Sequence, residues 1–132
     1  MNYTILLIED DPWLGELYSD ILQNESNATV LVCNSAEKAL LAINADTVDL
    51  IMLDMVLGEH NGIEFLHEIA SYSDSNVIPV IVLSSIYQHD FKMTRKRWLH
   101  YGVCNYLYKP DTKPADLVVA VKKQLAYPAG EL

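Results

Sequence analysis

Short apolar runs alternate five times with segments of helical spacing along this chain of 132 residues, and no other feature limits the possible folds as much. The apolar runs predict strands at residues 3–8, 29–33, 50–53, 77–83 and 104–108. Helical spacing follows each run, at about residues 12–24, 36–43, 63–70, 90–101 and 113–126. Strands that alternate with helices in this way form a parallel sheet with helices on both faces.

Five such units predict an open α/β sheet of the flavodoxin-like kind. Its expected strand order is 2-1-3-4-5, with a cleft at the tips of the first and third strands. A closed barrel would need eight units, and the chain is too short for it. We expect one domain at residues 1–127, followed by a flexible tail at residues 128–132.

Charge is distributed unevenly along the chain. Residues 1–80 carry 14 acidic residues and one basic residue, whereas residues 81–132 carry four acidic and eight basic residues. The net charge of −9 argues against direct binding of nucleic acid, which needs a basic face, and favours protein partners. No apolar run approaches the roughly 20 residues of a membrane span, and the N-terminus lacks a secretory signal, so we expect a cytoplasmic location.

Polar residues follow four of the predicted strands. Glu9 and Asp10 follow the first strand, Asp54 the third, Ser84 the fourth and Lys109 the fifth. Because the carboxyl ends of parallel strands meet at one edge of a sheet, we expect these side chains to lie close together. Three neighbouring carboxylates repel one another unless a cation lies between them, which predicts an Mg²⁺ site formed by Glu9, Asp10 and Asp54. An alternative that stays open is that Asp10 and Asp11 only cap the next helix.

These residues also suggest a reaction. Asp54, beside a metal ion and a lysine, can act as a nucleophile toward phosphorus and form an acyl phosphate. Ser84 and Lys109 would then bind phosphoryl oxygens. The residue two positions after Asp54 is Val56, so the second acid that some aspartyl phosphatases use as a general acid is absent. No G-x-x-x-x-G-K-[ST] loop is present either, which argues against nucleotide hydrolysis.

The order of these features resembles the receiver domains of two-component response regulators over nearly the whole chain. Gly62 follows Asp54 by eight residues, Ser84 follows it by thirty, and Tyr-Leu-Tyr-Lys-Pro closes the last predicted strand at residues 106–110. The resemblance implies a switch similar to chemotaxis regulators, in which a histidine kinase or a histidine phosphotransfer protein phosphorylates Asp54 with the help of Mg²⁺. It implies no enzyme activity beyond the domain's own phosphorylation and dephosphorylation.

The resemblance also implies how the signal leaves the site. In this family a strand-end hydroxyl, here Ser84, moves toward the phosphoryl group, and an aromatic three residues before the lysine, here Tyr106, fills the space left. The movement shifts the surface of the fourth helix, the fifth strand and the fifth helix, which binds a downstream protein or an effector domain. The Lys109–Pro110 peptide bond would be cis, and a weak homodimer stays open.

Two regions give this chain its own character. Four of the residues 92–97 are basic, and they form either a solvated helix face or a docking surface for an acidic protein. Val56 and Ile86 lie two residues after Asp54 and Ser84, beside the path of the hydrolytic water in the family. Both side chains are apolar, so we expect a long-lived acyl phosphate.

Two other functions compete with a phosphorylated switch. A receiver-like module could bind partners without phosphorylation, but the presence of the acids, the hydroxyl and the lysine disfavours it. A small metal-dependent phosphatase that acts on a soluble substrate is disfavoured because no residue is placed as a general acid.

Overall fold

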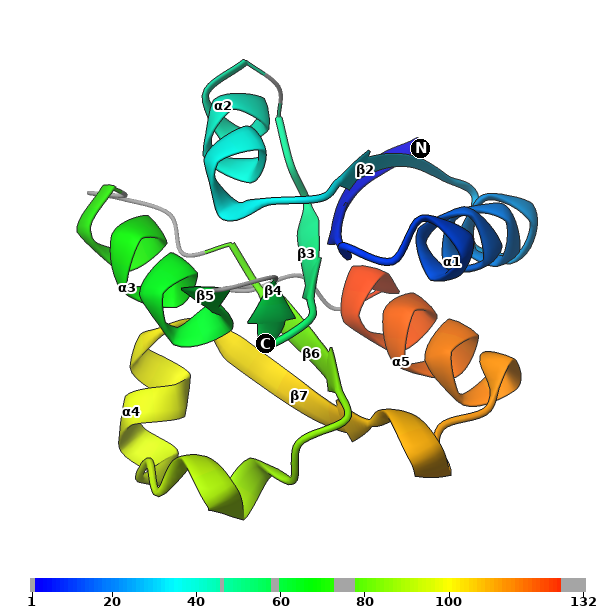
Figure 1. Cartoon of the computed structure of the whole chain (residues 1–132). Helices are drawn as coiled ribbons and strands as arrows, with labels where there is room; N and C mark the ends of the chain where they lie inside the picture. The colour runs from blue at the N-terminus through cyan, green and yellow to red at the C-terminus, as the bar shows by residue number, and fades with distance from the viewer. Residues whose placement is uncertain (1, 46, 58–59, 73–77, 127–132) are drawn as a thin grey trace.

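Five parallel strands form the central sheet of the computed structural model (Figure 1), which describes residues 2–45, 47–57, 60–72 and 78–126. The strands are β1 (Tyr3–Ile8), β2 (Ala28–Cys33), β3 (Leu50–Leu53), β6 (Val80–Ser84) and β7 (Val103–Tyr108). They are ordered β2-β1-β3-β6-β7. Since β6 and β7 are the fourth and fifth strands of this sheet, the predicted order 2-1-3-4-5 is confirmed.

Helices cover both faces of the sheet, as Figure 1 shows. One face carries α1 (Pro12–Ser26) and α5 (Pro114–Ala126), and the other carries α2 (Ala36–Ala45), α3 (Gly62–Tyr72) and α4 (Arg95–His100). In β3, Leu50 and Met52 pack on the α1 and α5 side, whereas Ile51 and Leu53 pack on the opposite side. This two-sided burial explains why the strand is a continuous apolar run.

The chain turns from β1 into α1 through a capped helix start. The carboxylate of Asp11 accepts hydrogen bonds from the backbone N–H groups of Trp13 and Leu14, and Pro12 occupies the first turn. The helix runs to Ser26, two residues beyond its predicted end, where Asn27 adopts the left-handed conformation with a φ of 51°. Capping is thus the observed role of Asp11.

The predicted helix at residues 90–101 is wrong. The structure has a short 3-10 helix, η1 (Gln88–Phe91), then a break, and then α4 with only six residues. Lys92 adopts a left-handed conformation with a φ of 53°, which ends η1, and the Thr94 hydroxyl caps α4 by accepting the Arg97 N–H. The connection after β6 therefore holds two short helical pieces in place of one long helix.

The loop after β3 contains a small antiparallel pair that the sequence did not predict, formed by β4 (Val56–Leu57) and β5 (His60–Asn61). A second short 3-10 helix, η2 (Lys109–Asp111), follows β7. No peptide bond among the described residues is cis, so the expectation of a cis Lys109–Pro110 bond is wrong here.

No helix in the described ranges is long and apolar enough to cross a membrane. The predicted tail at residues 128–132 lies outside the described residues, and the domain bounds stay a prediction.

Candidate functional site

The carboxyl ends of four strands bring the sequence-predicted residues to one edge of the sheet. The Asp54 N–H donates to the Ile8 carbonyl at 3.1 Å, which places the end of β3 beside the end of β1. Asp54 is 7% exposed and Ser84 is fully buried, whereas Asp10 is exposed. A carboxylate at such depth needs compensation by charge or hydrogen bonds.

Lys109 provides that compensation. Its Nζ lies 2.8 Å from Oε1 of Glu9 and 2.9 Å from Oδ2 of Asp54. The second oxygen of Asp54, Oδ1, accepts the N–H of Val56 at 3.0 Å. Both oxygens of Asp54 thus receive a hydrogen bond, and one ammonium group bridges two buried acids.

Burial and charge shift the pKa values of this cluster. Burial raises the pKa of Glu9 above its usual value, Lys109 opposes this effect, and the neighbouring Asp54 adds to it. For Lys109 burial alone would lower the pKa, but hydrogen bonds to Glu9 and Asp54 outweigh burial and raise it. The lysine is therefore held in its charged form.

Glu9, Asp10 and Asp54 could together hold a metal ion. Each offers one carboxylate oxygen, and the three oxygens lie within 4.8 Å of one another. Oxygen ligands that include one or two carboxylates suit Mg²⁺, which fills its remaining positions with water and phosphate oxygens. The donor set therefore fits the predicted magnesium site.

Ser84 and Tyr106 belong to one hydrogen-bond network. The Ser84 hydroxyl oxygen accepts the Ile86 N–H at 3.1 Å, and the Tyr106 hydroxyl donates to the Ile86 carbonyl. Burial raises the pKa of Tyr106, while a hydrogen bond with the Ser84 side chain lowers it. Ile86 therefore joins Ser84 to Tyr106. The backbone of Val56 likewise binds Asp54, so both apolar residues singled out in the sequence bind site side chains through their backbone.

Sequence reasoning missed two aromatic residues near the site, Tyr87 and Tyr108. Their rings stack with centroids 4.1 Å apart and planes inclined by 19°. The one available signal was the position of Tyr108, two residues after Tyr106 and therefore on the same side of β7.

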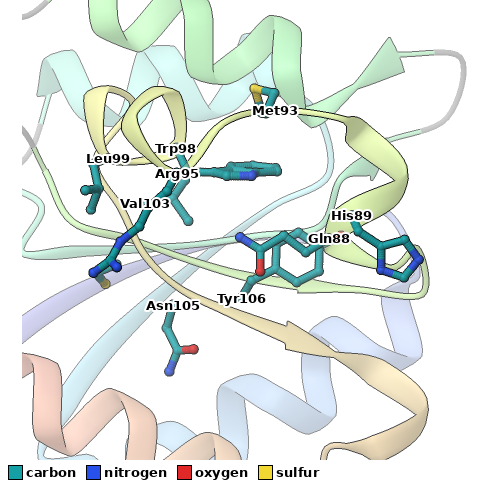
Figure 2. Close-up of a pocket in the computed structure, with 10 residues that line it drawn as sticks. Gln88, His89, Met93, Arg95, Trp98, Leu99, Val103, Asn105 and Tyr106 are labelled. Atoms are coloured by element: carbon teal, nitrogen blue, oxygen red, sulfur yellow. The ribbon is translucent and has the colours of Figure 1, made fainter.

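A groove of about 610 Å³ opens between α4, η1 and β7, next to Tyr106. Figure 2 shows Trp98 extending from α4 over the groove, with the Tyr106 ring below it and Arg95 reaching down past Val103 toward β7. Trp98 meets Tyr106 edge to face, with ring centroids 5.7 Å apart. The described lining residues carry no acidic side chain. Because Tyr106 lines the groove, a change in the position of its ring would change the groove wall.

Known proteins resemble this chain over most of its length. Residues 5–122 match the family model of the response regulator receiver domain. The transcriptional regulatory protein MalR of Bacillus subtilis is 33% identical over 107 residues, which make up 80% of this chain and 43% of MalR. The transcriptional regulatory protein CpxR of Klebsiella pneumoniae is 35% identical over 106 residues, 80% of this chain and 42% of CpxR. The chain spans less than half the length of either regulator.

Solved structures agree with this assignment at the level of the fold. A CheY-like response regulator receiver domain protein from Methanospirillum hungatei superposes with a TM-score of 0.81 at 22% sequence identity. The superposition covers 96% of this chain and 95% of the other.

Proposed function

This chain belongs to the response regulator receiver domain family, whose members are signalling modules controlled by phosphorylation, and we propose that Asp54 is its phosphoryl acceptor. The supporting observation is a buried carboxylate at the tip of β3 that contacts Lys109 and shares an acidic cluster with Glu9 and Asp10. In the proposed step one Asp54 oxygen bonds to phosphorus while the bond from phosphorus to an imidazole nitrogen of the donor breaks, and that nitrogen keeps the electron pair.

Glu9, Asp10 and Asp54 would hold Mg²⁺ in this reaction. When bound, Mg²⁺ supplies positive charge that stabilises the phosphoryl oxygens. Lys109, which bridges Glu9 and Asp54 at 2.8 and 2.9 Å, would donate to a phosphoryl oxygen as well. Positioning and charge neutralisation are what this arrangement of side chains can contribute to phosphoryl transfer.

The proton of the Ser84 hydroxyl would transmit the signal. Ser84 accepts the Ile86 N–H, so its own proton is free to donate to a second partner. We propose that a phosphoryl oxygen on Asp54 accepts this proton and so holds Ser84 and Ile86 in the positions in which the Ile86 carbonyl accepts the Tyr106 hydroxyl. The consequence is a larger population with the Tyr106 hydroxyl bonded to the Ile86 carbonyl and with the Tyr106 ring fixed in the wall of the α4/β7 groove.

The family supplies the classes of partner. A histidine kinase or a histidine phosphotransfer protein would phosphorylate Asp54, and a downstream protein or effector domain would read the state of α4, β7 and α5. We propose that the reader contributes an acidic segment with an apolar or aromatic anchor. Trp98, Met93 and Tyr106 offer the groove an apolar wall, and Arg95 gives it a positive rim.

Intact-mass measurement after incubation with a small phosphodonor and Mg²⁺ tests the proposal. We expect the gain of one phosphoryl group in the wild type and no gain in Asp54→Asn. Asp10→Asn should lose most of the Mg²⁺-dependent gain in mass. Asp11→Asn is the matched control, because Asp11 caps α1 and asparagine caps a helix equally well.

Other results would contradict this function. If the wild type takes up no phosphoryl group, the chain is a partner-binding module that does not use phosphorylation. If the donor is consumed without a retained adduct, the chain is a metal-dependent phosphatase.

A further inference from the structure

Tyr108, the last residue of β7, makes a ring contact at the edge of the proposed phosphorylation site. Tyr108 lies opposite Ser84 in the pairing of β6 with β7, and Lys109 follows it directly. Its ring stacks on Tyr87, which comes three residues after Ser84. The stack therefore joins the chain segment that leaves Ser84 to the strand end that carries Lys109.

The segment after β6 is held to β7 at two neighbouring points. The Ile86 carbonyl accepts the Tyr106 hydroxyl, and the Tyr87 ring packs on the Tyr108 ring. Tyr106 and Tyr108 are two residues apart in one strand, so both project from the same side of β7. Because the Ile86 N–H also donates to Ser84, the position of Ile86 sets the position of the Ser84 hydroxyl.

Burial does not account for the stack. Tyr87 is 48% exposed, so its packing contributes little to the apolar core. The ladder between β6 and β7 ends at Ser84 and Tyr108, so backbone pairing does not fix residues 85–87. Without the stack, Ile86 would be held by its hydrogen bonds to Ser84 and Tyr106 and by the start of η1, where the Tyr87 carbonyl accepts the Asp90 N–H.

We propose that Tyr87 and Tyr108 are positioning residues that hold Ile86, and through it Ser84 and Tyr106, in the signalling arrangement before any phosphoryl group is present. This inference rests on the proposed role of Ser84 and Tyr106 in the switch. An aromatic pair changes an equilibrium by a factor of about 2 to 10. The population with Tyr106 bound to Ile86 is raised by that factor in the unphosphorylated protein, which reduces the conformational change left for phosphorylation to drive.

Trp98 provides a built-in probe for this arrangement, because its ring contacts Tyr106 edge to face. The chain has two tryptophans, so Trp13→Phe leaves Trp98 as the single tryptophan, which can be excited apart from the tyrosines. In this background Tyr108→Leu removes both the ring and the hydroxyl, whereas Tyr108→Phe removes the hydroxyl alone, so the two variants distinguish the effects of the two groups. We expect Tyr108→Leu to alter Trp98 emission before phosphorylation, to enlarge the emission change on phosphorylation, and to slow phosphorylation about 2- to 10-fold. Tyr108→Phe should behave as the parent does.

Tyr87→Leu extends the test from the other side of the stack. It removes a ring that is about half exposed and that also stacks on His89, outside the core, so the variant should fold even if Tyr108→Leu does not. The two leucine substitutions should have the same effect, and the double variant should add little to either one. Additive effects, or parental emission and rates in both leucine variants, would overturn the inference. Tyr108→Phe behaving like Tyr108→Leu would also overturn it, because the hydroxyl would then be the active group.

The outcome for the stack can be told apart from the outcome for the proposed function. If the parent protein takes up no phosphoryl group, the function proposed for Asp54 fails. The emission of the unphosphorylated variants still reports whether the stack holds Tyr106 in place.

Discussion

Lys109 compensates the charge of two acids at once, because its ammonium group contacts the buried carboxylates of Glu9 and Asp54. Removing one partner of a buried ion pair is costly, since the remaining charge is left in a poorly solvated position. Burial raises the pKa of Glu9 and Lys109 opposes this rise, so removal of Lys109 would raise the pKa of Glu9 further. A folded-state pKa above the unfolded value gives stability that is present at low pH and is lost as pH rises.

Replacing Lys109 with methionine should therefore destabilise the metal-free protein in a pH-dependent way. We expect a loss of about 3 kcal/mol at pH 8 and a smaller loss at pH 5, where Glu9 can take up a proton. Urea unfolding at the two pH values measures the difference. Lys113→Met, at an exposed site, should stay within about 0.5 kcal/mol of the wild type. An equal loss at both pH values would contradict the role given to Glu9.

Val56 sets a second expectation for a single residue. Its side chain is 41% exposed beside Asp54, and it offers no hydrogen bond to an attacking water. Val56→Asn should speed the loss of the phosphoryl group several-fold, as followed by intact mass over time, whereas Val56→Leu should keep the slow rate. Rapid loss from the wild type, with no increase in Val56→Asn, would exclude an apolar barrier to hydrolysis.

The elements show which parts of the structure are coded locally. Strand β3 is predictable because burial on both faces needs an unbroken apolar run, and the start of α1 is predictable because Asp11 and Pro12 are adjacent. The short α4 is not, since the left-handed Lys92 and the Thr94 cap compete with a helical pattern that continues past them. Contacts between distant residues, such as Tyr87 with Tyr108, leave no periodic signal at all.

The start of α3 gives a prediction at the scale of elements. A Cβ atom on Gly62 would lie 2.7 Å from Met55 Sδ and 3.0 Å from Met55 Cα. The backbone contact cannot relax easily, so Gly62→Ala should cost about 1 to 3 kcal/mol of unfolding free energy. Overlap at this position would push α3 away from the end of β3.

Gly15→Ala is the matched comparison. Its Cβ would lie 3.1 Å from Val32 Cγ1, on a side chain that is partly exposed and able to rotate. Alanine is favoured over glycine by about 1 kcal/mol inside a helix, so this substitution in α1 should be neutral or stabilising. Denaturant midpoints decide the matter, and equal losses for the two variants would refute the steric explanation.

At the scale of the whole molecule, acidic and basic residues are distributed unevenly between the two parts of the chain. Its first 80 residues carry 14 acids and one base, while the rest carries four acids and eight bases. The proposed phosphorylation site lies where the acidic part meets Lys109, and α4 displays Arg95, Lys96 and Arg97. A partner that approaches α4 therefore meets positive charge on a protein that is negative overall, which favours an acidic segment and a salt-dependent association rate.

Selection of a random peptide library on the phosphorylated domain tests this expectation. The enriched peptides should be acidic and should contain an apolar or aromatic anchor. Their affinity should fall about tenfold in Arg95→Glu, equivalent to about 1.4 kcal/mol. Lys113→Glu, at an exposed site before α5 and outside the groove, is the control. Enrichment of basic peptides, or equal binding to both variants, would rule out the proposed partner chemistry.

The two hydrogen bonds on Asp54 have a consequence for how the resting state can be imitated. Lys109 and the Val56 N–H both donate, one to each carboxylate oxygen, whereas asparagine has one acceptor oxygen and an NH₂ group. In Asp54→Asn one of the two donors must face another donor. The substitution would block the proposed phosphorylation but would also disturb Lys109 or the start of β4. A wild-type protein kept away from phosphodonors is therefore the better reference for the unphosphorylated state.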